Sequence, residues 1–244
     1  MSLAYYGAFV FLSGTLLNAA TVLCGGLIGT LVGDRLPHRI RENVLRGVGL
    51  FTLAMGAKFA LDTGNVLYLL GSILVGGTLG SLASLDARLT TLGDALQQRL
   101  GRSGGTVSEA FVTSTIVFCV GPLTFLGSIQ NGLSGDPSLL TIKSVLDGFS
   151  AIAFAATLGW GVLLSIAVII VYQGGLAAGA TLFSGLLSEP QLREMGAVGG
   201  LLILGVGLKL LRLRDVAVAD FLPAILVAPA LVAGVAKVRE TIGL

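Results

Sequence analysis

Amide, hydroxyl and ionisable side chains inside apolar segments are the residues of this sequence that could do chemistry. The richest such stretch spans residues 118–148 and holds Ser128, Gln130, Asn131, Lys143 and Asp147. Charged side chains within a membrane are costly and tend to be functional. Because Lys143 and Asp147 are four residues apart, they share one face of a helix. They either line a path for a solute or form an interfacial ion pair that orients the helix.

A break at Gly121-Pro122 interrupts a predicted helix over residues 110–129. Proline removes a backbone hydrogen bond and frees carbonyl groups. Beside a cavity, freed carbonyls can coordinate a cation or bind a substrate; otherwise a neighbouring side chain fills the kink. The candidate path for a substrate or ion consists of Asn18, Ser114, Gly121, Pro122, Ser128, Gln130, Asn131, Lys143, Asp147 and Gln173.

Gln173 stands mid-way along a predicted apolar helix, where its amide needs hydrogen-bonding partners. A polar cavity would supply them, and so would a structural bond to another helix. No predicted helix carries an unpaired charge at its centre, which argues against a proton pump and favours a neutral or weakly polar solute. Paired carboxylates on one face, metal-ligand spacings and a histidine beside a nucleophile are all absent, so neither an enzyme, a metal site nor a cofactor is expected.

The elements that position these residues must be transmembrane helices. Hydrophobic residues make up 54% of the 244 residues and charged residues only 11%, whereas a soluble domain carries about 25% charged residues. About 20 apolar residues cross a bilayer as a helix. The sequence predicts eight spans, over residues 9–33, 44–61, 66–85, 110–129, 145–158, 162–187, 196–211 and 221–236. The fifth and sixth are hardest to separate, so seven spans is the alternative.

The predicted fold class is therefore all-α, a single polytopic transmembrane domain. An amphipathic helix over residues 86–100 is expected on the membrane surface, with leucines along one face. Ten lysines and arginines fall in one set of loops and five in the other. The positive-inside rule then places both termini outside if there are eight spans. That count assigns Lys143 to a loop.

An internal repeat relates the two ends of the chain. Residues 49–58 and 200–209 share the pattern Gly-Leu-x-x-Leu-x-x-Gly-x-Lys, and Gly25-Gly26-Leu27 aligns with Gly174-Gly175-Leu176 at nearly the same offset. Residues 14–85 therefore resemble residues 162–236, with residues 110–158 as a central helix pair. Five spans separate the copies, so the second copy is inverted, as in many transporters and some channels. Chance likeness between glycine- and leucine-rich helices is the alternative.

Glycines recur every four residues in several segments, as at Gly25, Gly29 and Gly33, and again at Gly76 and Gly80. Small residues at this spacing let helices approach closely. Two structures fit the pattern: tight packing inside one bundle, and a homodimer formed through the glycine-rich faces. The nearly even balance of 15 basic and 13 acidic residues argues against nucleic acid as a partner and leaves the lipid bilayer.

Several motifs resemble one known family. They are Gly14-Thr15-Leu16-Leu17-Asn18, Phe118-Cys119-Val120-Gly121, Gly127-Ser128, Gly132-Leu133-x-Gly135-Asp136, Lys143-Ser144-x-x-Asp147-Gly148 and Tyr172-Gln173-Gly174. In these residues the chain resembles the domain-of-unknown-function 554 family of prokaryotic membrane proteins, from Gly14 onward. Family members often begin near the Gly-Thr motif, so residues 1–13 are an addition. The resemblance implies an inner-membrane protein and supplies no substrate.

These observations lead to two hypotheses. The first is a transporter or channel for a small solute or ion, with a polar path lined by the central helices. The second is a non-transporting membrane scaffold, sensor or assembly partner that docks through the amphipathic helix.

Overall fold

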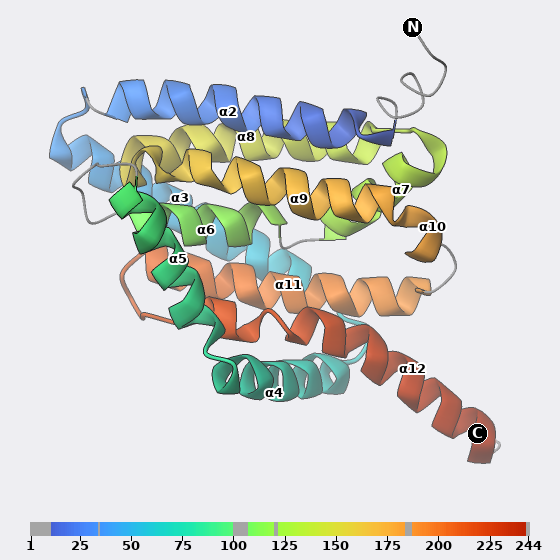
Figure 1. Cartoon of the computed structure of the whole chain (residues 1–244). Helices are drawn as coiled ribbons and strands as arrows, with labels where there is room; N and C mark the ends of the chain where they lie inside the picture. Colours follow the sequence, from blue (N-terminus) through green and yellow to red (C-terminus); the bar gives the residue numbers. More distant parts are fainter. Residues whose placement is uncertain (1–10, 34, 100–106, 120–121, 184–186, 243–244) are drawn as a thin grey trace, which may run out of the picture. The chain divides into compact units, whose positions relative to one another are not determined.

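A computed structural model describes residues 11–33, 35–99, 107–119, 122–183 and 187–242. Every element of this part is helical (Figure 1). The elements are α2 (Ser13–Gly33), α3 (His38–Ala60), α4 (Val66–Leu82), α5 (Leu85–Arg99), α6 (Val107–Cys119), α7 (Pro122–Ser134), α8 (Ser138–Leu158), η1 (Trp160–Leu164), α9 (Ser165–Ala178), α10 (Ala180–Phe183), α11 (Glu189–Leu210), η2 (Val218–Phe221) and α12 (Ala224–Ile242).

Five helical segments of the described part are long and apolar enough to cross a membrane: α2, α8, η1 with α9, α11, and η2 with α12. Two bent pairs raise the number to as many as seven, with bends of 52° between α4 and α5 and 59° between α6 and α7. Helix α3 belongs to neither group of candidate spans, because charged residues occupy its first turns. The described part of the chain is thus all-helical, with five to seven candidate spans.

Three helices begin well before the apolar run that predicted them. Helix α3 begins at His38, α8 at Ser138 and α11 at Glu189, where the predictions were residues 44, 145 and 196. Hydropathy marks the part of a helix that suits lipid, whereas capping groups set its first residue. At α11, for example, Ser188 and Gln191 form a capping box. Pro223 was predicted inside the last helix, but it precedes α12.

The chain divides into two compact units. The first holds the residues up to 49 and those from 90 to 186, which include α2 and α6 to α10. The second holds residues 50–89 and those from 187 onward, which include the second half of α3, together with α4, α11 and α12.

In the first unit, α2 lies directly against α8 along a line of glycines (Figure 1). A side chain at Gly25 would meet the backbone of Gly148, one at Gly29 would meet Ile152, and one at Gly33 would meet Ala156. Because the residue numbers rise together, the two helices run in the same direction. The intrachain packing expected from the glycine spacing is therefore seen at these three positions.

Replacing Gly29 with alanine should separate α2 from α8 and lower the free energy of unfolding by about 1–3 kcal/mol, as overpacking does. The new methyl group would overlap the carbonyl oxygen of Ile152. Gly175→Ala is the matched control, because nothing lies within 4 Å of a methyl group there, and alanine suits a helix better than glycine. Thermal unfolding of both purified variants measures the difference. Equal midpoints would contradict the close packing.

Helix α9 returns antiparallel to α2 in the same unit. Gly159, at a φ of 94°, ends α8, and the short η1 helix turns the chain. A side chain at Gly26 of α2 would meet Leu163 of η1, and Thr15 of α2 lies next to Gly174 of α9. The predicted fifth and sixth helices are therefore separate, antiparallel helices.

The broken helix α6–α7 runs beside α9. A side chain at Gly161 of η1 would meet Val107, where α6 begins, and a side chain at Gly132 of α7 would meet Ala177 of α9. The start of α6 thus lies near the start of α9, and the end of α7 lies near the end of α9. The α6–α7 pair and α9 therefore run in the same direction. The predicted break is confirmed by the 59° bend. Gly121 lies outside the described residues, and α7 begins at Pro122.

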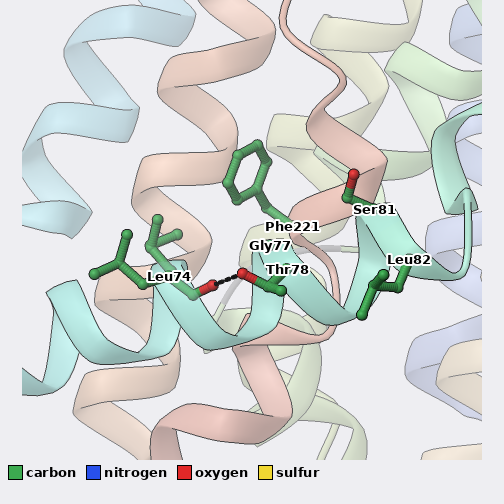
Figure 2. A pocket seen from close by; sticks show the side chains of 7 residues that line it. Leu74, Gly77, Thr78, Ser81, Leu82 and Phe221 are labelled. Atoms are coloured by element: carbon green, nitrogen blue, oxygen red, sulfur yellow. Dashed lines mark hydrogen bonds between the residues drawn. The ribbon is translucent and has the colours of Figure 1, made fainter.

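The second unit is built from antiparallel helix pairs. Leu53 of α3 lies against Gly207 of α11, and Gly56 lies against Leu204. Helix α4 packs on α12 and η2 in the same manner, since a side chain at Gly76 would meet Ala224 and one at Gly80 would meet Asp220. Figure 2 shows the ring of Phe221 over Gly77, beside a hollow lined mostly by apolar side chains of α4. Leu74 and Leu82 at its rim are well exposed, which suits contact with lipid.

The buried carboxylate of Glu194 on α11 closes the connection between α3 and α4. It accepts hydrogen bonds from the Thr63 hydroxyl at 2.6 Å and from the backbone amides of Gly64 at 2.7 Å and Asn65 at 3.2 Å. These groups precede the first turn of α4, where amides have no intrahelical partner. Glu194 therefore fixes the start of α4 from another helix.

Replacing Glu194 with alanine should lower the free energy of unfolding by about 2–4 kcal/mol, because it leaves the Gly64 amide without its acceptor and the Asn65 amide with only the Thr63 hydroxyl. The matched control is Glu189→Ala, which removes an exposed carboxylate from the first turn of the same helix. The midpoints of thermal unfolding compare the two. A loss as small as that of the control would mean that water replaces the carboxylate.

Candidate functional site

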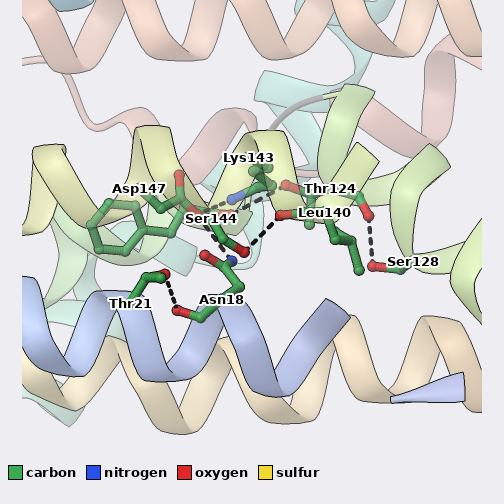
Figure 3. A network of polar contacts seen from close by, with 9 residues as sticks. Asn18, Thr21, Thr124, Ser128, Leu140, Lys143, Ser144 and Asp147 are labelled. Atoms are coloured by element: carbon green, nitrogen blue, oxygen red, sulfur yellow. Dashed lines mark hydrogen bonds and ion pairs between the residues drawn. The ribbon is translucent and has the colours of Figure 1, made fainter. Parts of the chain in front are cut away.

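A buried ion pair on α8 lies at the centre of the first unit. The Lys143 ammonium group bonds the Asp147 carboxylate, and the Asn18 side-chain amide on α2 donates to the same carboxylate oxygen at 3.0 Å (Figure 3). Lys143 is 5% exposed, Asp147 6% and Asn18 not at all. Lys143 therefore belongs to the second turn of a helix and not to a loop, and the pair is buried among helices.

The position of the pair follows from where α8 begins. Asp136 accepts a hydrogen bond from the backbone amide of Ser138 at 2.9 Å and so fixes the first turn. At a rise of about 1.5 Å per residue, Asp147 lies about 14 Å along a helix of about 31 Å. If α8 spans a membrane, the pair is near mid-depth, where an ion pair needs buried polar neighbours.

Hydroxyl groups surround the pair, and most of them bond to backbone carbonyls. Ser144 donates to Leu140 at 2.6 Å, and Ser128 donates to Thr124 at 2.6 Å (Figure 3). Thr124 itself donates to the carbonyl oxygen of Phe118 at 3.2 Å, across the break between α6 and α7. A side chain thus fills the kink at this carbonyl. Ser114 on α6 is also fully buried, and its hydroxyl bonds to its own helix.

Three buried side chains on α2 and α9 keep polar atoms without a hydrogen-bond partner among the described residues. They are the hydroxyl of Thr15, the amide oxygen of Asn18, and both the oxygen and the nitrogen of the Gln173 amide. Thr15 and Asn18 are one turn apart on α2, and Gln173 is fully buried on α9. Each unpaired buried polar group lowers the free energy of unfolding by about 1–3 kcal/mol. Helix packing alone gives no reason to keep such groups at these positions.

Helix α9, which carries Gln173, packs on α2 and on α7. The next residue, Gly174, lies against Thr15, and Ala177, one turn later, packs on Gly132 of α7. We therefore group Gln173 with the polar residues around the ion pair and call the set the central cluster: Thr15, Asn18, Thr124, Ser128, Lys143, Ser144, Asp147 and Gln173.

Two predicted path residues lie at the end of the unit instead. Asn131 accepts a hydrogen bond from the backbone amide of Gly14 at 3.0 Å and donates to the Ser13 hydroxyl at 3.2 Å, so it caps α2. Gln130 donates to Asp136 at 2.6 Å in the connection between α7 and α8. Hydrogen bonds from the backbone and side chain of Ser138, and from Gln130, hold the pKa of Asp136 below its ordinary value.

Of the predicted residues, Asn18, Lys143 and Asp147 are thus joined by hydrogen bonds, while Ser128 lies on α7, which packs on α8, and Gln173 on α9, which packs on α2. Pro122 stands at the break, and Gly121 lies outside the described residues. Sequence reasoning missed Thr15, Thr124 and Ser144 as members of the site. Thr15 could have been found from its position one turn before Asn18, and Thr124 from its position two residues after the proline.

The central cluster offers binding chemistry rather than a strong charge. One ammonium and one carboxylate group cancel, and the remaining groups are amides and hydroxyls. In the described residues, no three histidine, cysteine, aspartate or glutamate side chains gather as metal ligands would. The arrangement can bind and orient a polar molecule through hydrogen bonds.

Comparisons with known proteins agree with the motifs. A family model described as "Protein of unknown function (DUF554)" matches residues 13–233. The chain belongs to the DUF554 family. Over 220 residues it is 32% identical to "Uncharacterized protein YqgA" of Escherichia coli (strain K12), which covers 88% of the chain and 94% of the relative.

A second DUF554 relative carries the word membrane in its name. The chain is 26% identical over 223 residues to "Uncharacterized membrane protein YdfK" of Bacillus subtilis (strain 168), covering 90% of the chain and 95% of that relative. No solved structure matches the chain. Since the family match begins at residue 13, it includes the whole of α2 and every residue of the central cluster.

Proposed function

We propose that this DUF554 protein moves a small polar solute or ion across the prokaryotic inner membrane, along a path through the central cluster. The observation that carries the proposal is the fully buried Gln173 amide, whose polar atoms have no partner among the described residues. Its helix packs on α2, which carries Asn18, and on the broken helix α6–α7. A bound solute would supply the missing hydrogen bonds. The proposal gives the protein no catalytic role.

Broken helices are a common feature of transporter binding sites, because their ends present backbone groups at mid-depth. In the first unit, Thr124 at the start of α7 donates to the carbonyl oxygen of Phe118 near the end of α6. Polar groups of two helix ends thus meet at the break, which favours binding of a solute at this depth. A purely structural bundle would gain stability from apolar side chains at the same positions.

Helix directions support eight spans. Counted as the first and fifth spans, α2 and α8 must run the same way, and they do. As the fourth and sixth spans, the α6–α7 pair and α9 must run antiparallel to α2, and both do. Helix α3 would be the second span, through its apolar residues after the charged first turns. Eight spans and the positive-inside rule put both termini outside.

An inverted repeat also gains support. The three helix pairs that the repeat makes equivalent, α2 with α9, α3 with α11 and α4 with α12, each pack antiparallel, as a two-fold axis in the membrane plane requires. The repeat register pairs residue 53 with 204 and residue 56 with 207. Exchanging the copies therefore turns the contact of Leu53 with Gly207 into that of Leu204 with Gly56, and both contacts occur.

A further sequence match lies in α4 and α12. Residues 70–75 and 222–227 share the pattern Leu-x-x-Ile-Leu-Val. The offset between these segments is 152 residues, against 151 for the α3 and α11 segments, so the two matches differ in offset by a single residue. In this arrangement the broken helix and α8 have no counterpart. The unrepeated part therefore carries Thr124, Ser128, Lys143, Ser144 and Asp147 of the central cluster, whereas Thr15, Asn18 and Gln173 lie on the equivalent helices α2 and α9.

Flux measurements in proteoliposomes test the proposal. Purified protein should carry at least one of urea, glycerol, glycine, sodium, potassium or chloride faster than protein-free liposomes. Asp147→Asn and Gln173→Leu should abolish this flux, and Gly175→Ala should keep it, because Gly175 has open space around it. Flux that survives both cluster variants would place the path elsewhere. No flux of any solute would favour the scaffold or sensor.

A further inference from the structure

We propose that the solute bound by the central cluster has no net charge and carries both hydrogen-bond donors and acceptors. This inference rests on the proposed function and narrows it to one chemical class, which includes uncharged amides and alcohols and also zwitterions. Three features of the cluster carry it: its charge balance, its mixture of donors and acceptors, and the placement of these groups on three helices.

The charge balance comes from Lys143 and Asp147, which are paired and buried together. The other cluster members are neutral. A charged solute would therefore add a net charge to a buried site, and moving an ion away from water costs several kcal/mol unless an opposite charge receives it. A cation would have to displace the ammonium group of Lys143, and an anion the carboxylate of Asp147. A neutral solute leaves the pair intact, and a zwitterion can contact both partners.

The unpartnered atoms include donors and acceptors. The amide oxygens of Asn18 and Gln173 accept, the amide nitrogen of Gln173 donates, and the Thr15 hydroxyl can do either. The Asn18 amide cannot be reversed, since its nitrogen already donates to Asp147. A bare cation would use only the oxygens and leave the Gln173 nitrogen unpaired. A solute with a carbonyl and an N–H or O–H group can satisfy all of them.

These groups come from helices that meet in the first unit. Thr15 and Asn18 lie on α2, the ion pair on α8 and Gln173 on α9, and α2 contacts both other helices. Figure 3 shows the Asn18 and Asp147 side chains directed toward each other across the α2–α8 contact. A solute held between Gln173 and Asn18 would therefore contact α2 and α9 at once and lie next to the ion pair.

Ligand-dependent stability tests the class without any transport. The full chain in lipid nanodiscs is heated with acetamide, urea, glycine, sodium chloride, potassium chloride or ammonium acetate, each at about 100 mM, which saturates a site with a Kd of about 1 mM. A bound ligand raises the unfolding midpoint. Acetamide, urea or glycine should raise it in the wild type and not in Gln173→Leu. The variant also controls for general osmolyte effects, and Gly175→Ala should respond as the wild type does.

The outcomes separate the two proposals. A rise with acetamide or urea identifies an uncharged solute, and a rise with glycine alone identifies a zwitterion; both support the class. A rise with the salts alone, or no rise with any of the three neutral probes, overturns it. A neutral probe that binds but does not cross proteoliposomes overturns transport and leaves the class standing. Flux of an ion alone overturns the proposed class of solute and leaves transport standing.

Discussion

Replacing Asp147 with leucine should lower the free energy of unfolding by about 3–5 kcal/mol, because Lys143 then becomes a buried charge without a partner. The ammonium group lies inside the first unit, 5% exposed, and its one described partner is the Asp147 carboxylate. Asn18 also loses its acceptor, since its amide nitrogen donates to that carboxylate. The purified variant should therefore unfold at a markedly lower temperature than the wild type.

The double variant Lys143→Met with Asp147→Leu makes this prediction specific. With both charges gone, no unpaired ion remains, and apolar side chains of similar size often replace a buried pair at little cost. The double variant should thus be more stable than Asp147→Leu alone. Asp136→Leu is the control for an exposed carboxylate that precedes the same helix and bonds its first turn, and it should cost only about 1 kcal/mol, as the loss of a helix cap does. Additive losses in the double variant would show that the two residues act independently.

The same variants separate stability from function. If the pair only orients α8, the double variant should keep whatever flux the protein has, because the helix is still anchored by its glycine contacts with α2. If the pair contacts the solute, flux should disappear although the fold is restored. Flux in proteoliposomes and unfolding midpoints, measured on the same preparations, distinguish the two roles.

How much of the site could be predicted depends on the distance along the chain between its parts. The spacing of Lys143 and Asp147 was enough to place them on one face, because four residues make about one helical turn. Their burial was not predictable, since it depends on α2, which is more than 100 residues away. Asn18 could be recognised as an intramembrane amide, but its bond to Asp147 spans 129 positions.

The errors have physical causes of the same kind. Lys143 was assigned to a loop because charge interrupts an apolar run, yet a charge with a partner one turn later can continue the helix. Gln130 and Asn131 are adjacent amides, and no local signal separates the one that bonds Asp136 from the one that caps α2. The helical fold itself followed from composition, because apolar segments of that length leave few other structures for the backbone in a membrane.

Replacing Gln173 with leucine should raise the free energy of unfolding by about 1–3 kcal/mol, the cost of a buried polar group without partners, and abolish flux. Leucine has a similar size and needs no hydrogen bond. A residue selected for folding alone would not carry this cost, whereas binding sites commonly trade stability for function. The measurement is the unfolding midpoint without added solute, together with flux in proteoliposomes.

Thr30→Val is the matched control for this substitution. The Thr30 hydroxyl on α2 already donates to the carbonyl oxygen of Gly26 at 2.8 Å, so its removal should change neither stability nor flux by much. A Gln173→Leu variant that is less stable than the wild type would mean that the amide has partners in the folded protein, and the binding role would fall with it. A variant that is more stable and still transports would show that the buried amide lowers the stability of the protein but is not needed for transport. Only a gain in stability joined to a loss of flux fits a side chain whose hydrogen bonds are completed by the solute.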